Sequence, residues 1–102
     1  MIELEAMPKS VYFVPAVIKF YGDTCAPCKM MVPIYAKVEN IYKERVDFYS
    51  INVDKVPIEQ LHSMGIYTVP SFMFCKAETE NKVVSGAMPL ASLCGNIETY
   101  CL

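Results

Sequence analysis

The feature that most constrains this chain is a pair of cysteines two residues apart, Cys25 and Cys28, at a change of local pattern. Residues 14–21, before the pair, are apolar except for Lys19, as in a strand buried on both faces of a sheet. From residue 25 to about residue 45, apolar residues recur at helical spacing. The pair is therefore expected where a buried strand meets the first turn of a helix. The apolar face of that helix is predicted to consist of Met31, Ile34, Tyr35, Val38, Ile41 and Tyr42.

A helix start favours the ionised form of a cysteine placed there. The N–H groups of the first turn have no partner within the helix, and this end carries a partial positive charge. Both effects stabilise a thiolate, so we expect a lowered pKa for Cys25, and the thiolate is the nucleophile in disulfide exchange. Cys28 lies one turn into the helix and reaches back to close a compact disulfide. The placement predicts that Cys25 attacks and that Cys28 resolves.

The alternative for such a pair is metal binding. A structural zinc ion takes four ligands, but the chain has no second C-x-x-C and only one histidine, His62, which we expect to be solvated. The sequence therefore favours redox chemistry and predicts no metal. Ligation between two chains, each giving Cys25 and Cys28, remains an alternative.

The rest of the chain alternates between strand and helix patterns. We expect strands at residues 46–53, 70–75 and 82–85, a polar turn at 78–81, an edge strand at 2–5, a short helix within 54–64, and a last helix from Pro89. This order predicts an α/β fold with a central mixed β-sheet flanked by helices on both faces, its last two strands forming a hairpin. With 102 residues and no repeat or linker, residues 1–102 are expected to form one domain.

Composition excludes several functions. The chain is 54% hydrophobic and carries a formal net charge of −2, which indicates a globular protein and disfavours nucleic-acid binding. No stretch reaches the roughly 20 apolar residues of a membrane span, so no membrane partner is expected. Glu3 and Glu5 stand where a secretory signal would carry positive charge. We therefore expect a cytoplasmic protein.

Residues 20–29, FYGDTCAPCK, resemble the active-site segment of thioredoxins, whose usual core is W-C-G-P-C-K. Pro33 lies five residues after Cys28, where thioredoxins carry a proline within the helix, and residues 51–54, INVD, resemble the end of a thioredoxin strand. The segment ending at Pro70 and the glycine at Gly86 also match, so the resemblance runs from about residue 14 to the C-terminus. It implies a thioredoxin fold and a protein-disulfide reductase with a redox-active disulfide, acting in electron transport and cell redox homeostasis.

The resemblance also implies a substrate site. Pro70 is expected to be cis, which leaves the backbone of Val69 free to pair with an extended substrate segment. The groove for a disulfide-bearing protein would be lined by Tyr21, Ala26, Thr68, Val69, Pro70 and Gly86. The implied partners are disulfide-containing proteins and a thioredoxin-reductase-like electron donor. No cofactor is implied, because the cysteines carry the electrons.

The chain also departs from the usual thioredoxin pattern. Thr24 replaces tryptophan, and Ala26 replaces glycine. Lys19 stands where thioredoxins usually have a buried aspartate, and Ser50 where many have a lysine. Lys19 either approaches the inner cysteine and tunes its ionisation, or extends its stem along the sheet and places its ammonium in water. Pro27 is a second candidate for pKa tuning.

Two further functions stay open. The segment Thr68-Val69-Pro70 is also similar to glutaredoxins, which use glutathione, although the chain lacks the Gly-Gly run that follows in them. A binding module that uses the fold as a scaffold is the other alternative, and the intact C-x-P-C argues against it.

The remaining sulfur-bearing residues have structural explanations. Cys75, in a strand pattern, is expected to be a core residue, and Cys94 and Cys101 lie seven apart on similar faces of the last helix. An exposed Cys101 that forms an intermolecular disulfide is the less favoured alternative. Met30 and Met31 are expected to pack beneath the active site.

Overall fold

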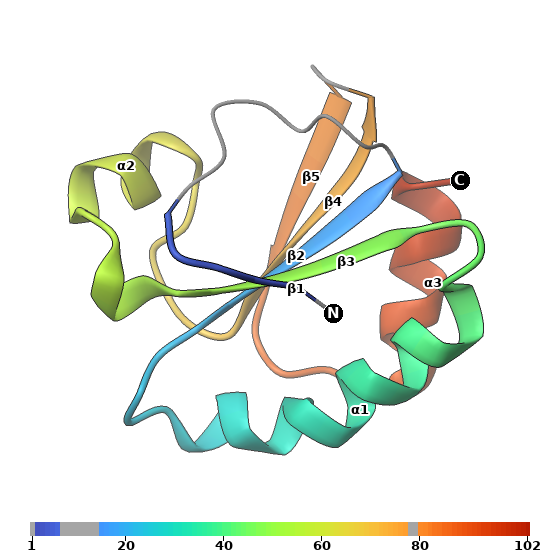
Figure 1. Ribbon diagram of the computed structural model, residues 1–102, viewed down its shortest axis with the longest axis horizontal. Helices are drawn as coiled ribbons and strands as arrows, with labels where there is room; N and C mark the ends of the chain where they lie inside the picture. Colours follow the sequence, from blue (N-terminus) through green and yellow to red (C-terminus); the bar gives the residue numbers. More distant parts are fainter. Residues whose placement is uncertain (1, 7–14, 78–79) are drawn as a thin grey trace.

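A five-stranded mixed sheet forms the centre of the structure, a computed structural model that describes residues 2–6, 15–77 and 80–102 (Figure 1). The strands lie in the order β1-β3-β2-β4-β5. β3 runs parallel to β1 and to β2, while β4 runs antiparallel to β2 and to β5. The strands are β1 (Ile2–Leu4), β2 (Ala16–Tyr21), β3 (Asp47–Asn52), β4 (Ser71–Ala77) and β5 (Glu80–Ser85).

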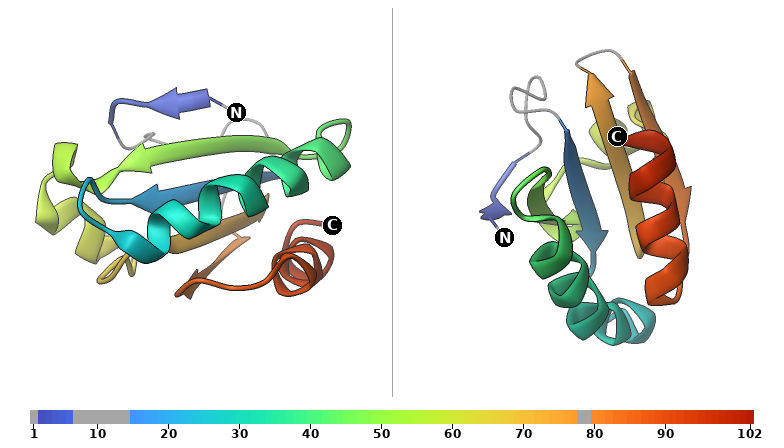
Figure 2. Two further views of the ribbon diagram at one scale, coloured as in Figure 1. Left: turned by 90° about the horizontal axis from the view of Figure 1, so that it is seen from below. Right: turned by 90° about the vertical axis from the view of Figure 1, so that its right-hand side faces the viewer.

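Helices cover both faces of this sheet. Helices α1 (Ala26–Tyr42) and α3 (Leu90–Tyr100) lie on one face, and α2 (Ile58–Ser63) lies on the other (Figures 1 and 2). A single 3₁₀ turn, η1 (Val53–Lys55), leads from β3 toward α2. The predicted α/β fold, with a mixed sheet flanked on both faces and a terminal hairpin of β4 and β5, is confirmed.

The position of β2 explains its nearly continuous apolar sequence. Val17 packs into the core beneath α1 and α3, whereas Ile18 and Phe20 pack into the core beneath α2. Side chains of a strand alternate between the two faces of its sheet, so a strand covered on both faces needs apolar residues at both. Only Lys19 departs from this pattern, and it is 4% exposed.

The predicted apolar face of α1 is partly confirmed. Its buried residues from Met31 onward are Met31, Tyr35, Val38 and Tyr42, and Ile34 packs against them. Ile41 was wrongly predicted, since it is 54% exposed. Ile34 and Ile41 are two turns apart on one flank of α1. Residues 87–89, just before α3, line a pocket together with Ile34, and Ile41 is not among the residues of that pocket. Met30, also wrongly predicted, is 67% exposed at the rim of the same pocket.

Most boundaries differ from the predicted ones by a few residues. Helix α1 ends at Tyr42 and not near residue 45, and Cys25 caps it instead of belonging to it. Strand β5 already begins at Glu80, because its backbone pairs with β4 from that residue onward. β5 is an edge strand, so its polar side chains remain in water and do not oppose pairing. Residues 14, 78 and 79, which belonged to a predicted strand and turn, lie outside the described residues.

Tyr35 links α1 to the sheet through its hydroxyl group. The oxygen lies 2.7 Å from the Tyr49 carbonyl oxygen and 3.2 Å from that of Val17, on neighbouring strands. The ring packs edge-on against Phe48, with 5.5 Å between centroids. Burial raises the pKa of Tyr35 well above its ordinary value, so the hydroxyl keeps its proton and remains a donor.

We expect Tyr35→Phe to lower the free energy of unfolding by about 1–2 kcal/mol, because buried carbonyl oxygens lose a donor. The measurement is urea denaturation followed by circular dichroism. Tyr67→Phe is the matched control: Tyr67 is 70% exposed, and removal of its hydroxyl should change stability by less than about 0.5 kcal/mol. Equal stabilities for the two variants would show that the Tyr35 hydroxyl contributes nothing.

Candidate active site

The two central cysteines form a disulfide where β2 leads into α1. Their Cα atoms are 5.2 Å apart. Cys25 is the N-cap of α1, and the backbone N–H of Cys28 donates to Cys25 Sγ over 3.1 Å. Cys25 is half-buried, whereas Cys28 is only 3% exposed. The site therefore presents Cys25 toward the surface and keeps Cys28 behind it.

A second loop approaches Cys25 from across the sheet. The Val69–Pro70 peptide bond is cis, as the resemblance implied, and the Val69 carbonyl oxygen lies 3.6 Å from Cys25 Sγ. Gly86 adopts a φ of 101°, a region open to glycine, and its N–H donates to the Pro70 carbonyl oxygen over 2.8 Å. Val69, Pro70 and Gly86 are thus brought together beside the disulfide.

Three other predicted groove residues are placed around this centre. Ala26 and Thr68 are exposed. Thr68 and Val69 line a pocket of about 260 Å³ that extends toward α2. Tyr21 instead lines a pocket behind Cys28, and its contribution to a substrate groove stays a prediction.

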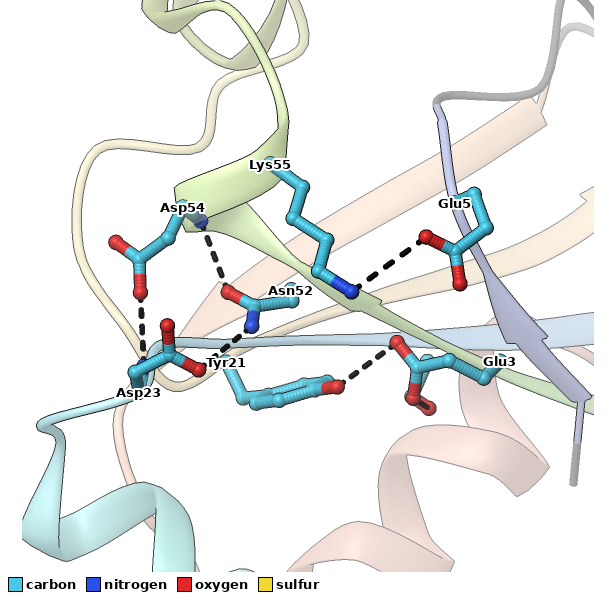
Figure 3. Close-up of polar contacts among 8 residues, drawn as sticks. Glu3, Glu5, Tyr21, Asp23, Asn52, Asp54 and Lys55 are labelled. Carbon is cyan, nitrogen blue, oxygen red and sulfur yellow. Dashed lines mark hydrogen bonds and ion pairs between the residues drawn. The ribbon is translucent and has the colours of Figure 1, made fainter.

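A polar network fixes the loop that precedes Cys25 (Figure 3). Asn52 donates from Nδ2 to Asp23 Oδ1 over 2.8 Å, and the N–H of Asp23 donates to Asp54 Oδ2 over 2.8 Å. The N–H of Asp54 donates back to Asn52 Oδ1 over 2.9 Å. These bonds hold the end of β2 against the end of β3. No role for Asp23 or Asn52 was predicted; the only signals were the likeness of residues 20–29 to a thioredoxin active-site segment and that of residues 51–54 to a thioredoxin strand end.

Glu3 on β1 is a further residue of the site, for which no role was predicted from the sequence. Its carboxylate accepts a hydrogen bond of 2.8 Å from the Tyr21 hydroxyl (Figure 3). It accepts a second one, also of 2.8 Å, from the Ser50 hydroxyl. Burial, followed by the hydrogen bond to Glu3 and its negative charge, raises the pKa of Tyr21 to about 12. The available signal was the predicted edge strand, which by itself does not say which strand it pairs with.

Lys19 lies in the same pocket as Cys28. The pocket has a volume of about 340 Å³ and is lined by both residues together with Glu3, Tyr21 and Ser50, among others. The Lys19 Nζ lies 4.8 Å from the ring centroid of Tyr35 and 5.6 Å from that of Tyr21. Burial lowers the pKa of Lys19, and the negative charge of Glu3 acts in the opposite direction.

The other cysteines lie away from the site. Cys75 is a core residue, as predicted, and burial raises its pKa to about 12. The alternative in which Cys101 is exposed is wrong. Cys101 caps α3 and is 1% exposed, and its thiol lies 3.5 Å from the Ala16 carbonyl oxygen. Burial raises the pKa of Cys101 to about 11. Cys94 is half-buried.

The described residues contain neither a cluster of metal-binding side chains nor a helix that could span a membrane. No group of three or more His, Cys, Asp or Glu side chains is arranged to hold a metal ion in residues 2–6, 15–77 and 80–102. Within the same ranges, no helix is both long and apolar enough to cross a membrane. His62 is exposed and its ring lies against Tyr67, with 4.8 Å between centroids.

The class of thioredoxin-fold proteins is defined by three features that this structure combines. They are a mixed β-sheet flanked by helices, a C-x-x-C disulfide at a helix start and a cis-proline that faces it. The family model described as Thioredoxin matches residues 9–99. This chain belongs to the thioredoxin family.

Known proteins share this likeness in sequence and structure. A thioredoxin of Borreliella burgdorferi is 35% identical over 72 residues, which are 71% of this chain and 61% of that protein. A chloroplastic thioredoxin-like protein of Oryza sativa subsp. japonica is 38% identical over 85 residues, 81% of this chain and 32% of that protein. The chain thus spans less than two thirds of either relative. The crystal structure of a Malassezia sympodialis thioredoxin matches with a TM-score of 0.71 and 30% identity, over 83% of this chain and 73% of that one.

The cysteines should differ sharply in reactivity once the disulfide is reduced. With iodoacetamide at about pH 8, Cys25 should be alkylated rapidly, while Cys75 and Cys101 remain thiols because folding raises their pKa values. Mass spectrometry of peptides from native and urea-unfolded protein provides the measurement. Rapid alkylation of Cys75 or Cys101 in the native protein would contradict their burial.

Proposed function

We propose that this chain is a thiol–disulfide oxidoreductase that reduces disulfides in partner proteins, with residues 1–102 acting as one thioredoxin-like domain. One observation supports this above all: the disulfide at the start of α1 pairs a half-buried Cys25 with a buried Cys28. Membership in the thioredoxin family supports the same conclusion.

The first step is an attack by Cys25. In the reduced protein its thiolate is stabilised by the N–H of Cys28 and by the positive end of α1. The thiolate attacks one sulfur of a substrate disulfide, and a bond forms between that sulfur and Cys25 Sγ. The substrate S–S bond breaks, and its second sulfur leaves with the electron pair and takes a proton from water. A mixed disulfide remains.

The second step is resolution by Cys28. After losing its proton, Cys28 attacks Cys25 Sγ, to which it lies close enough to form a disulfide. The bond between Cys25 and the attacked substrate sulfur breaks, and that sulfur leaves as a thiolate that is then protonated. The substrate has gained two electrons, and the chain has lost two. A thioredoxin-reductase-like donor is proposed to restore the dithiol.

The substrate is proposed to dock beside Val69. The Val69 carbonyl lies next to Cys25 Sγ, so an extended segment that pairs with the Val69 backbone brings its own disulfide to the attacking sulfur. The proposed groove residues are Tyr21, Ala26, Thr68, Val69, Pro70 and Gly86.

Two residues are proposed to tune the cysteines. Pro27 lies in the first turn of α1 and has no N–H group, which limits the donors available to Cys25. Lys19 lines the pocket behind Cys28. We place the activity in the cytoplasm, in electron transport and cell redox homeostasis. No cofactor or metal is required, because the two cysteines carry the electrons.

Reduction of insulin disulfides by dithiothreitol tests this proposal. The protein should accelerate the reaction, and Cys25→Ser should return the rate to that of dithiothreitol alone. Cys28→Ser, reduced beforehand and freed of dithiothreitol, should instead accumulate a mixed disulfide with insulin, detected by mass spectrometry, because the site has no second thiol to resolve it. Cys94→Ser is the matched control and should keep full activity.

Other outcomes would contradict the proposal. Full biological activity of Cys25→Ser would indicate a binding module. Activity that appears only with glutathione and its reductase would indicate a glutaredoxin-like enzyme.

A further inference from the structure

Three polar residues lie in one row across the sheet. The register of β1 and β3 pairs Glu3 with Ser50, and that of β3 and β2 pairs Ser50 with Lys19. Paired residues on neighbouring strands share a face of the sheet, and Val17, two residues before Lys19, packs beneath α1 on this face. The row therefore runs from the edge of the sheet to the strand that leads into the active site.

This row and the inner cysteine line the same pocket. Cys28 is 3% exposed, yet it lines the pocket of about 340 Å³ together with Glu3, Lys19 and Ser50. The volume exceeds what a water molecule needs. Cys28 therefore borders a space large enough to hold water, and the row of Glu3, Ser50 and Lys19 lines the same space.

The pocket contains charges of both signs. The acidic and basic groups that line it come from three elements and a loop: Glu3 from β1, Lys19 and Tyr21 from β2, Asp23 from the following loop, and Lys29 from α1. β3 contributes only the hydroxyl of Ser50, and Tyr35 lies under the Lys19 ammonium. Lys19 is the buried cation of this set, and Glu3 is the carboxylate held by two hydroxyl donors.

We propose that Lys19 and Glu3 form a charge couple that sets how readily Cys28 ionises for the resolving step. The Lys19 ammonium attracts the Cys28 thiolate across the pocket, and the Glu3 carboxylate offsets part of that attraction. Both are positioning residues, and neither exchanges a proton with Cys28. The proposal rests on the proposed function, because it concerns the second step of that reaction.

The geometry favours a purely electrostatic role for Lys19, in which it does not transfer a proton. Its Nζ sits over the Tyr35 and Tyr21 rings, an arrangement that stabilises the cation. Glu3 is held in the same pocket, because Tyr21 and Ser50 each donate to one carboxylate oxygen. Removing either charge should therefore change the ionisation of Cys28, in opposite directions.

A chromogenic disulfide, 5,5′-dithiobis(2-nitrobenzoate), separates the two steps. The reduced protein, carrying Cys94→Ser to remove a half-buried thiol, is mixed with the reagent in a stopped-flow instrument. Attack by Cys25 releases one nitrothiobenzoate, and attack by Cys28 on the mixed disulfide releases a second. The pH midpoint of the second release reports the ionisation of Cys28, whatever the plateau rate.

Lys19→Met should move this midpoint to higher pH, and Glu3→Gln should move it to lower pH, each by about 0.5–1 unit. Lys19→Arg should keep the midpoint close to that of the parent protein, because it keeps the charge although arginine cannot act as a base. Glu5→Gln is the matched control: it removes the same charge from a side chain that pairs with Lys55 and is not among those lining the pocket, and it should leave the midpoint unchanged.

Several outcomes would overturn the charge couple. These are unchanged midpoints in Lys19→Met and Glu3→Gln, shifts of both in the same direction, or a Lys19→Arg variant that behaves like Lys19→Met. Thermal unfolding by circular dichroism establishes that each variant is folded, and if Lys19→Met does not fold, Glu3→Gln and Lys19→Arg still decide the question. If the parent protein releases no second equivalent, the proposed function fails instead.

Discussion

The N–H of Cys28 donates to Cys25 Sγ at the first turn of α1, and the rest of the site is arranged around this contact. Because Cys25 caps the helix, its sulfur faces the unpaired donors of the first turn. The same turn carries Cys28 inward to 3% exposure. One helix start therefore gives two neighbouring cysteines opposite environments, which the two steps of disulfide exchange require.

The sheet keeps that helix start in place. β2 is buried between β3 and β4, so the junction that follows it is anchored on both sides. On the β3 side, Asn52 and Asp54 hold the loop at Asp23. On the β4 side, the cis peptide before Pro70 brings the Val69 carbonyl to Cys25 Sγ. The chemistry of a short loop thus depends on strands that are distant in sequence.

What the sequence could predict follows from the range of each interaction. The C-x-x-C, the apolar run of β2 and the helical periodicity of α1 are local patterns, and they correctly predicted the junction. The predicted burial of Ile41 was wrong, because burial of a helix flank depends on which distant segment covers it. Glu3 was missed because its bond to Ser50 spans 47 residues and depends on how β1 pairs with β3. In the sequence, Lys19 stands out only as a departure from the thioredoxin pattern. The residues that share its pocket come together only when the chain folds.

The reduction potential of the Cys25–Cys28 couple, measured by equilibration with defined mixtures of reduced and oxidised glutathione, tests the central claim most directly. A reductase should have a potential at or below that of the cytosolic glutathione pool, about −220 to −260 mV by biochemical extraction. A distinctly more oxidising value, near the roughly −120 to −180 mV of disulfide-forming and isomerising proteins, would contradict the account. It would mean that Lys19, Thr24 and Ala26 adapt the site to oxidation or isomerisation in another compartment.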